Sequence, residues 1–342
     1  MATSKRPELP FKGSVALSLA ITLSLLVLTD FILGKTQSFP PRLPEHFSSS
    51  YLDRFVRQVH DKKTLLVLGD SVLWGYGVKA QDSAVAILRR RYPGIRIVNA
   101  AYEAGTPINI DFLVRYMLQK KIRPQAVLFD LNPIAFSQLA KSYNTLNPAL
   151  EHLAVPALLE PFDATRLKTT GAAGDSSLSG RLDSFVERHW LLYAQRVDIH
   201  QAIFGDADAA SALSRRLILS PAPQEDAAGP PAYDLTPLGP QNVSFAYTRH
   251  LLRLLSKNHV AVTAFLTPTD HQLLREYVDV GPYDENLQRL EQLVRAEHVT
   301  ILNLDRQIPS NEFIDYMHLT KSGNAKLARL LMPEVGRTLN VF

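Results

Sequence analysis

The chain has no cysteine among its 342 residues. This absence excludes disulfide bonds, thiolate metal sites and a cysteine nucleophile. Charge of one sign is also not concentrated: 37 Lys and Arg residues against 33 Asp and Glu residues give a formal net charge of +4. A nucleic-acid-binding protein is expected to carry a basic stripe or patch, so the sequence predicts no nucleic-acid partner.

Two further kinds of ligand site are missing from the sequence. It contains no His-Glu-x-x-His pattern and no carboxylates at ligand spacing, so no metal site is predicted. It contains no glycine-rich phosphate loop, and no cofactor is expected. What is present is a hydrophobic fraction of 46%, which supports a packed core and excludes wholesale disorder.

The longest apolar run covers residues 13–34, and Asp30 is its only charged residue. As a helix, this run would be roughly 33 Å long, enough to cross a hydrocarbon core of about 30 Å. We expect a single transmembrane anchor, with residues 1–12 in the cytoplasm because three basic residues precede the run. This orientation places the rest of the chain outside the cytoplasm, in the periplasm. A cleaved signal peptide and a buried soluble helix are the alternatives.

The remaining chain divides into a linker and one domain. Residues 35–50 are rich in Pro and Ser and are expected to form the linker. Residues 51–342 are expected to form the domain. Within it, residues 142–240 include low-complexity stretches and break the pattern of the flanking chain. We interpret them as an insertion or cap over the site, and not as a second domain.

Short apolar runs alternate with amphipathic segments along the domain. The predicted strands are 64–68, 95–98, 126–130, 260–266 and 299–302, and the predicted helices are 82–91, 109–120, 244–257, 283–296 and 322–331. This alternation predicts an α/β three-layer sandwich with a five-stranded, mostly parallel sheet. Ligand sites of such sheets lie beyond the carboxyl ends of the strands.

The residues that follow the strands form a set with one chemistry. Ser71 follows the first strand, Gly105 lies in a loop after the second, and Asn132 follows the third. Asp315 and His318 come after the last strand. A serine hydroxyl is a weak nucleophile that needs an imidazole base, a carboxylate to orient the base, and donors for the oxyanion. These five positions supply all of these groups.

The segments that carry these residues resemble the four blocks of the SGNH (GDSL-type) hydrolase superfamily. The blocks are LVLGDSVLWGYG, the glycine of NAAYEAGTP, the asparagine of LFDLNP, and DYMH, in the order of the family. The resemblance covers roughly residues 64–134 and 260–335. It implies the compact, flavodoxin-like form of the fold predicted above, and serine ester chemistry.

Roles follow from the resemblance block by block. It implies that Ser71 is the nucleophile, that His318 is the general base and then the acid, and that Asp315 orients His318. It implies an oxyanion hole made of the backbone amides of Ser71 and Gly105 and the side-chain amide of Asn132.

Two blocks depart from the usual pattern of the family. The third block usually reads Gly-x-Asn-Asp, and here it reads Asp130-Leu131-Asn132-Pro133. A proline suits the first position of a helix, so Asn132 keeps its place at the turn. The second block has one residue more than expected before Gly105, so the amide of Ala104 is an alternative oxyanion donor.

Several other residues have two interpretations. Trp74, Tyr102 and Glu103 lie in or near the blocks and are candidates for substrate contact, with packing as the alternative for Trp74. The pair Asp270-His271 resembles a second catalytic dyad. A cap on the helix that follows is the favoured interpretation of that pair.

The leading functional hypothesis is a membrane-anchored serine O-acyl esterase or acyltransferase. Its expected substrate is an acylated carbohydrate, glycan or lipid of the cell envelope. Similar anchored members of the superfamily act beside membrane-embedded O-acyltransferases, which implies such a partner here. The alternatives are a non-catalytic glycan-binding or assembly protein and a lysophospholipase or thioesterase. The acyl group, the acceptor and the choice between hydrolysis and transfer stay open.

Overall fold

The computed structural model describes most of the chain outside the predicted insertion. The described residues are 11–36, 42–44, 47, 49–59, 63–103, 105–137, 146–154, 158–164, 166, 233 and 235–339. The predicted cytoplasmic residues 1–10 and most of the predicted insertion lie outside this part of the chain.

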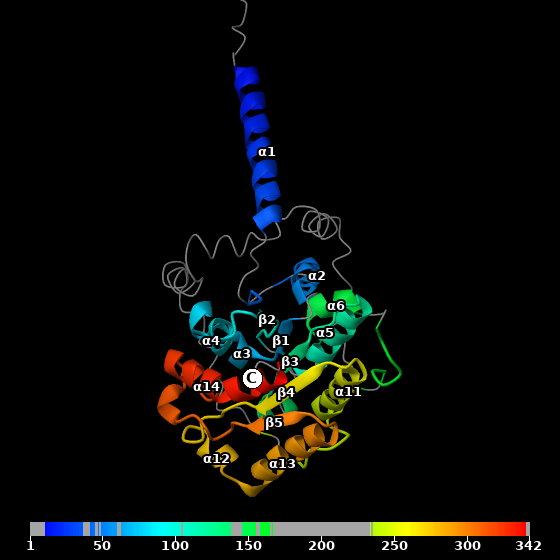
Figure 1. The fold of residues 1–342 in the computed structure, drawn as a ribbon, viewed down its shortest axis with the longest axis vertical. Coiled ribbons are helices and arrows are strands. Elements are labelled where there is room, and N and C mark those ends of the chain that lie inside the picture. Colours follow the sequence, from blue (N-terminus) through cyan, green and yellow to red (C-terminus); the bar gives the residue numbers. More distant parts are fainter. Residues whose placement is uncertain are drawn as a thin grey trace, which may run out of the picture.

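A five-stranded parallel sheet forms the centre of the domain, as predicted (Figure 1). Its strands are β1 (Thr64–Leu68), β2 (Arg96–Asn99), β3 (Ala126–Leu131), β4 (Ala261–Leu266) and β5 (Thr300–Asn303). They lie side by side in the order β2-β1-β3-β4-β5. Every residue of β1 and β3 is buried, as expected of central strands covered on both faces.

Helices cover both faces of the sheet. The elements on the domain are α2 (Ser49–Val56), η1 (Arg57–Val59), α3 (Ser71–Trp74), η2 (Ala80–Asp82), α4 (Ala84–Arg91), α5 (Pro107–Gln119), η3 (Pro133–Phe136), α6 (Pro148–Ala154), α11 (Val243–Lys257), α12 (Arg275–Val278), α13 (Gly281–Ala296), η5 (Ser310–Glu312) and α14 (Lys321–Thr338). α5 packs against α11, and α4 packs against α14. The two pairs form the outer layers of the domain. Right-handed crossovers between parallel strands place helices on the faces of the sheet in this way.

Most predicted elements agree with the observed ones to within two residues at each end. The last helix is the exception: it was predicted to end at 331, and α14 continues to Thr338 with Pro333 inside it. A proline inside a helix removes one backbone hydrogen bond and clashes with the preceding turn, but the buried Leu331 and Val335 on either side of Pro333 still pack on the core. Tertiary packing therefore extends the helix past its local stop signal.

The N-terminal apolar run forms part of α1 (Phe11–Thr36), which stands clear of the α/β layers in Figure 1. Its large apolar side chains at Leu17, Leu19, Ile21, Leu23, Leu25, Val27 and Leu28 are all exposed. Over the stretch that the structure describes, no helix combines the length and the apolar character required to span a membrane.

The predicted linker makes ordered contacts where the structure describes it. Leu43 is fully buried, and its carbonyl oxygen accepts a hydrogen bond from the indole Nε1 of Trp74 at 2.6 Å. Arg42 donates from Nη1 to the carbonyl oxygens of Trp74 and Gly75, at 3.0 and 2.7 Å. Its guanidinium also lies 4.0 Å above the Trp74 ring. The segment that precedes the domain is thus attached to the short helix α3.

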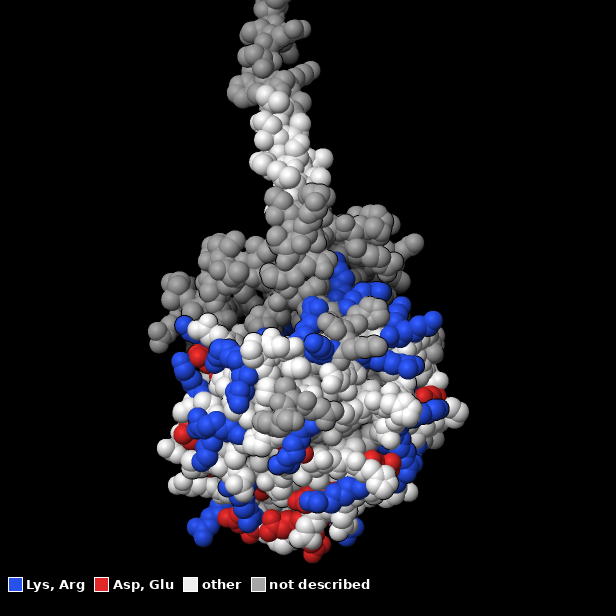
Figure 2. Space-filling view, viewed as in Figure 1, with Lys and Arg blue, Asp and Glu red and all other residues white. Residues whose placement is uncertain are grey.

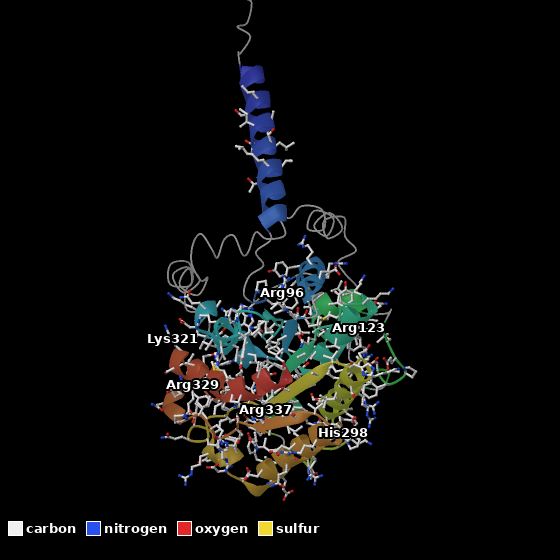
Figure 3. All side chains as sticks on the ribbon, in the orientation of Figure 1. Arg96, Arg123, His298, Lys321, Arg329 and Arg337 are labelled. Atoms are coloured by element: carbon white, nitrogen blue, oxygen red, sulfur yellow. The ribbon has the colours of Figure 1, made fainter. Side chains whose placement is uncertain are left out.

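Charged side chains are dispersed over the surface. Figure 2 shows Lys and Arg across the visible face, with Asp and Glu among them. Of the basic residues labelled in Figure 3, Lys321, Arg329 and Arg337 lie on α14, whereas Arg96, Arg123 and His298 lie on other segments. This distribution matches the absence of a basic stripe in the sequence.

Candidate active site

The chain reverses its direction across the sheet between β1 and β3. From β1 it moves to the edge strand β2, then crosses back to β3 on the other side of β1. At such a switch point, the loops beyond the two central strands diverge and leave a crevice. Ser71 begins α3 immediately after the β1 turn, and Asn132 follows β3.

Three side chains from two distant parts of the chain meet at this edge of the sheet. The Oγ of Ser71 lies 2.8 Å from Nε2 of His318, and Nδ1 of His318 lies 2.7 Å from Oδ2 of Asp315. Both Ser71 and His318 are buried. A carboxylate, an imidazole and a hydroxyl in this linear order form the charge pattern that activates a serine. The structure thus brings the three predicted catalytic side chains together.

Local structure holds Asp315 in place. Its Oδ1 accepts hydrogen bonds from the backbone amides of Met317 and His318, at 2.9 and 2.8 Å. Burial opposes ionisation of Asp315, but the hydrogen bond from the His318 ring and those from the two amides outweigh it and lower the pKa of Asp315. The carboxylate therefore stays charged and keeps the proton of His318 on Nδ1, which leaves Nε2 free to accept the proton of Ser71.

The turn that presents Ser71 has well-defined ends. Asp70 is the N-cap of α3, and its Oδ1 accepts a hydrogen bond from the amide of Val72 at 2.8 Å. Gly75 ends the helix at φ 87°, in the left-handed region that suits glycine. The first helical hydrogen bond runs from Trp74 to Asp70, so the amide of Ser71 has no acceptor within the helix and is left for a substrate oxygen.

Asn132 projects its side-chain amide toward the same crevice. Its Nδ2 donates to Oδ2 of Asp70 at 2.6 Å and lies 3.2 Å from Sδ of Met317. Its Oδ1 accepts from the amide of Ile134 at 3.3 Å, so Asn132 also caps η3. A thioether is a weak acceptor. The side-chain amide of Asn132 therefore has one strong acceptor, the carboxylate of Asp70, and one weak acceptor, the thioether of Met317.

Gly105 has a different environment from the one its predicted role requires. Its amide donates to the carbonyl oxygen of Tyr102 at 3.0 Å, within the same turn. A Cβ at this position would lie 2.1 Å from the carbonyl oxygen of Gly69. Close packing against the β1 turn explains the glycine, and the amide would have to leave its turn partner to bind an oxyanion. The alternative donor, Ala104, lies outside the described residues.

The three candidate substrate-contact residues differ in exposure. Trp74 is buried beneath Arg42 and Leu43, as described above. Tyr102 is buried, its ring lies edge-on to Phe47 with centroids 5.2 Å apart, and its hydroxyl finds no partner among the described atoms. Glu103 is exposed in the same loop.

Tyr76 and Ile314 lie beside His318, and of these two residues only Ile314 was not connected with the site from the sequence. The Tyr76 ring packs against the His318 imidazole with centroids 4.3 Å apart, and Tyr76 is 42% exposed. Ile314, which is 50% exposed, donates its amide to the carbonyl oxygen of His318 at 2.7 Å. Gly77 lies against it, since a Cβ there would be 2.5 Å from Cδ1 of Ile314. The rim beside the catalytic imidazole is thus apolar and accessible.

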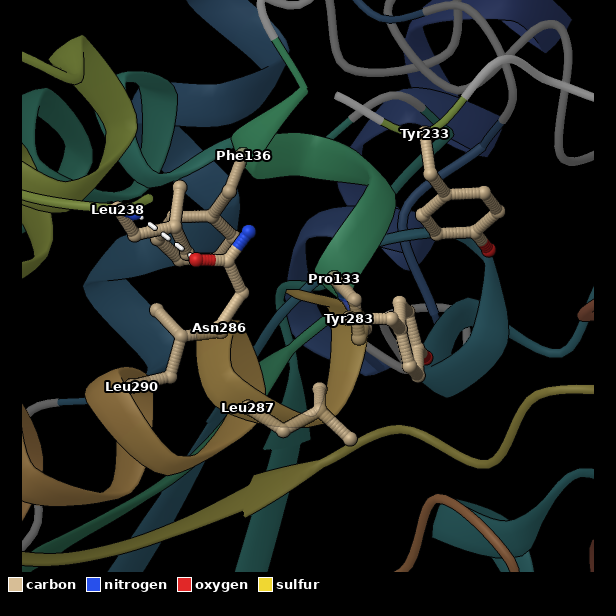
Figure 4. Close-up of a pocket in the computed structure, with 8 residues that line it drawn as sticks. All are labelled: Pro133, Phe136, Tyr233, Leu238, Tyr283, Asn286, Leu287 and Leu290. Carbon is tan, nitrogen blue, oxygen red and sulfur yellow. Dashed lines mark hydrogen bonds between the residues drawn. The ribbon is translucent and has the colours of Figure 1, made fainter. Parts of the chain in front are cut away.

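A separate, small apolar pocket lies beyond η3 (Figure 4). It is lined by Pro133, Phe136, Tyr233, Leu238, Tyr283, Asn286, Leu287 and Leu290. The Oδ1 of Asn286 accepts from the amide of Leu238 across it, at 2.8 Å. The catalytic side chains are not among its lining residues, and we interpret it as the seam where the chain after residue 232 packs on α13.

The pair Asp270-His271 has a structural role, although Asp270 does not cap the helix that follows, α12, whose N-cap is Leu274. Oδ1 of Asp270 accepts from the amides of Gln272 and Leu273, at 3.0 and 3.1 Å, and so caps the turn that follows. His271 instead lies between Asp279 and Asp305, at 2.8 and 2.6 Å. This pair therefore contributes no second dyad.

Comparisons with known proteins give similarity only at the level of solved structures. The chain matches no protein-family model and no curated protein sequence. A lipolytic protein of the G-D-S-L family from Desulfitobacterium hafniense DCB-2 aligns with a TM-score of 0.35 and 11% identity, over 79% of this chain and 99% of that one. Esterase EstA from Pseudoalteromonas sp., inhibited by monoethylphosphonate, aligns with a TM-score of 0.40 and 11% identity, over 81% of this chain and 99% of that one. A catalytic mutant of the acetylxylan esterase Axe2 from Geobacillus stearothermophilus aligns with a TM-score of 0.39 and 13% identity, over 81% of this chain and 95% of that one.

Proposed function

We propose that the chain is a serine-dependent O-acyl ester hydrolase or acyltransferase of SGNH type. The observation that carries this proposal is the continuous contact from Asp315 through His318 to Ser71, at 2.7 and 2.8 Å. Binding alone requires no such series. This geometry also argues against the alternative of a non-catalytic glycan-binding or assembly protein.

The reaction follows from the positions of the three groups. Nε2 of His318 takes the proton of Ser71 as Oγ attacks the ester carbonyl carbon. The carboxylate of Asp315 stabilises the imidazolium that forms. The tetrahedral intermediate collapses, His318 returns the proton to the leaving alkoxide, and an acyl-serine remains on Ser71. Water or a sugar hydroxyl then attacks the acyl group, with His318 acting as base again, and releases Ser71.

Negative charge develops on the oxygen of the ester carbonyl during the reaction, and hydrogen-bond donors beside Ser71 are needed to stabilise it. The amide of Ser71 and the Nδ2 of Asn132 are the two that the described geometry offers. An oxyanion would replace Sδ of Met317 as the partner of the second Asn132 N–H. A charged acceptor binds an N–H more strongly than a thioether does, so this interaction strengthens as the transition state forms.

The proposed location is the outer face of a membrane, with the domain in the periplasm. Support comes from the apolar run 13–34, from the basic residues before it, and from the exposed apolar side chains of α1. Only five residues separate the end of α1 from Arg42, which is attached to α3. Such a segment reaches at most about 20 Å. This attachment would hold the crevice close to the membrane surface.

The proposed substrate is an acylated carbohydrate or glycan of the cell envelope. A site held near the membrane surface suits a polymer that is modified as it is exported, and a membrane-embedded acyltransferase is the proposed partner. The acetylxylan esterase among the structural neighbours acts on an acetylated glycan by its printed name. The dispersed surface charge gives no preference for a strongly charged polymer.

One observation favours a second candidate, a lysophospholipase or thioesterase. The accessible rim beside His318 carries the large apolar side chains of Tyr76 and Ile314. Such a rim would also accommodate a longer acyl chain by burying its methylene groups, at about 0.8 kcal/mol each.

The two candidates are separated by the length of the acyl chain and by the fate of the acyl group. Turnover of nitrophenyl esters should fall from acetyl to decanoyl for the carbohydrate enzyme and rise for the lipase. Mass spectrometry of the envelope polysaccharide should then compare cells that produce the wild type with cells that produce S71A. More acyl groups with S71A indicate an esterase, and fewer indicate a transferase. An unchanged polysaccharide would contradict the carbohydrate assignment.

A further inference from the structure

Two carboxyl groups lie buried directly beneath the catalytic serine. Asp70 precedes Ser71, and Asp130 is the fifth residue of β3, two positions before Asn132. Asp70 is 8% exposed and Asp130 is 4% exposed. The reaction described above uses neither of them, and Asp130 stands where the third block of the SGNH pattern usually has glycine.

The contacts of Asp70 connect two parts of the active site. Its Oδ1 caps α3 through the amide of Val72, and its Oδ2 accepts from Nδ2 of Asn132 at 2.6 Å. The backbone amide of Asp70 donates to Oδ2 of Asp130 at 3.2 Å. The two carboxyl groups are close enough for each to shift the pKa of the other.

The backbone around Asp130 is fitted to its carboxyl group. A Cβ on Gly69 would lie 2.4 Å from that group, so only glycine at residue 69 leaves room for it. The arrangement therefore depends on residues of both β1 and β3, which pair in the centre of the sheet.

Two carboxylates in contact and out of water cannot both carry a charge. Burial raises the pKa of Asp70, although donors on both of its oxygens favour its charged form. Burial and the neighbouring charge of Asp70 raise the pKa of Asp130 well above its usual range. These directions favour a pair with one negative charge, on Asp70, and one proton, on Asp130.

We propose that Asp130 is a positioning residue whose carboxylic acid O–H donates to Asp70 and thereby fixes the carboxylate that holds both the Ser71 helix and the Asn132 amide. The effect of Asp130 on catalysis rests on the proposed function. The sharing of one proton between Asp70 and Asp130 does not rest on it. Loss of this proton places two negative charges side by side, which separates Asp70 from its partners.

Other titratable groups face the pair from the segment after η5. His318 and Tyr316 interact electrostatically with Asp70, and Asp315 lies next to both of them. Burial raises the pKa of Tyr316, so Tyr316 also loses its proton only at alkaline pH. A substitution of Asp130 itself is therefore needed to assign an alkaline loss of activity.

The first measurement is made on the resting protein and requires no turnover. Difference infrared spectroscopy of the wild type at pH 7 should show the carbonyl stretch of a buried protonated carboxylic acid. This band should be absent from D130N and present in D305N, which removes a buried carboxyl group outside the site. A band that persists in D130N, or no band in the wild type, would overturn the proposal whatever the enzyme does.

The second measurement is the pH dependence of Ser71 reactivity. The reactivity is measured as the rate of phosphonylation or of nitrophenyl acetate turnover. An asparagine at 130 still donates to Asp70, so D130N should keep kcat at pH 7 within about threefold. D130A lacks the donor, and its kcat should fall by about 10- to 100-fold with a smaller change in KM. The wild type and D305N should lose Ser71 reactivity as the pH rises into the alkaline range. In D130N this loss of reactivity should occur at higher pH.

Two results of this experiment would contradict the positioning role. One is an alkaline loss in D130N that matches the wild type. The other is equal activity of D130A and the wild type at pH 7. A wild type that never reacts at Ser71 but shows the infrared band would refute the proposed function and leave the proton-sharing pair established.

Discussion

Two histidines of this fold, the buried His318 and the partly buried His271, each have both ring nitrogens occupied, yet only His318 is suited to catalysis. His318 contacts one carboxylate and one hydroxyl, whereas His271 contacts the carboxylates of Asp279 and Asp305. Burial opposes protonation of His271, but the two carboxylates outweigh it and raise the pKa of His271. An imidazole held between two carboxylates is protonated more readily, and neither of its nitrogens is left to accept a proton from a nucleophile.

A third histidine follows the His271 pattern. Nδ1 of His250 lies 2.7 Å from Asp111, and its Nε2 lies 3.3 Å from Glu160. The hydrogen bond with Asp111 raises the pKa of His250 despite its partial burial. Arg115 and Asp163 complete this buried network, with Nη1 of Arg115 2.6 Å from Oδ2 of Asp163. A contact between a histidine and a carboxylate therefore does not identify a catalytic base. The group that contacts the other ring nitrogen of the histidine identifies it.

The strongest test of this difference is removal of the catalytic pair. S71A and H318A should each lower kcat by about 10⁴- to 10⁶-fold, because nucleophile and base act as one unit. The double variant should be no worse than either single one. Circular dichroism and the thermal midpoint should match the wild type. Full activity of H318A would transfer the role of base to another histidine.

Removal of the oxyanion donor should have the next largest effect. N132A should lose about 2.7–4 kcal/mol of transition-state stabilisation, or about 10²- to 10³-fold in kcat, with KM little changed. The matched control is N286A, which removes a buried asparagine side chain from the pocket beyond η3. A fully active N132A would show that this side chain does not contact the oxyanion.

Substitution of His250 should affect stability and leave the chemistry intact. H250Q should reduce the free energy of unfolding by about 1–3 kcal/mol, because Asp111 then lies buried with a weaker donor. A raised pKa in the folded state means that this contribution is present at low pH and is lost as the pH rises through that pKa. Chemical denaturation of both proteins from pH 5 to pH 9 should show a difference that narrows with rising pH. A constant difference would contradict the charged state assigned to His250.

The smallest effect is expected for His271. H271Q should keep turnover within about twofold and lose about 0.5–1.5 kcal/mol of stability, since the hydroxyl of Tyr283 still donates to Asp305 at 2.8 Å. A loss of activity as large as that of N132A would show that His271 takes part in the reaction.

The sequence predicted the parts of this molecule that depend on local pattern. Apolar runs located the five strands, and a parallel sheet necessarily brings the residues after its strands to one edge. That rule placed Ser71 near Asn132, and the chain order of the blocks added Asp315 and His318.

Contacts between distant segments carried no local signal. The hydrogen bond between Asn132 and Asp70 and the close packing of Gly105 on Gly69 depend on how loops pack at that edge. The attachment of Arg42 to Trp74 lies in a stretch whose Pro and Ser content resembles a linker. The rim residue Ile314 looks like any other apolar side chain until the fold exposes it.

The measurement that tests the account most directly is labelling by a small serine-reactive phosphonate, read by intact mass and peptide mapping. The account predicts one adduct per chain, on Ser71, in the wild type and in H271Q, none in S71A, and a rate reduced by several orders of magnitude in H318A. A folded wild type that takes up no label, or an adduct on a residue other than Ser71, would contradict it.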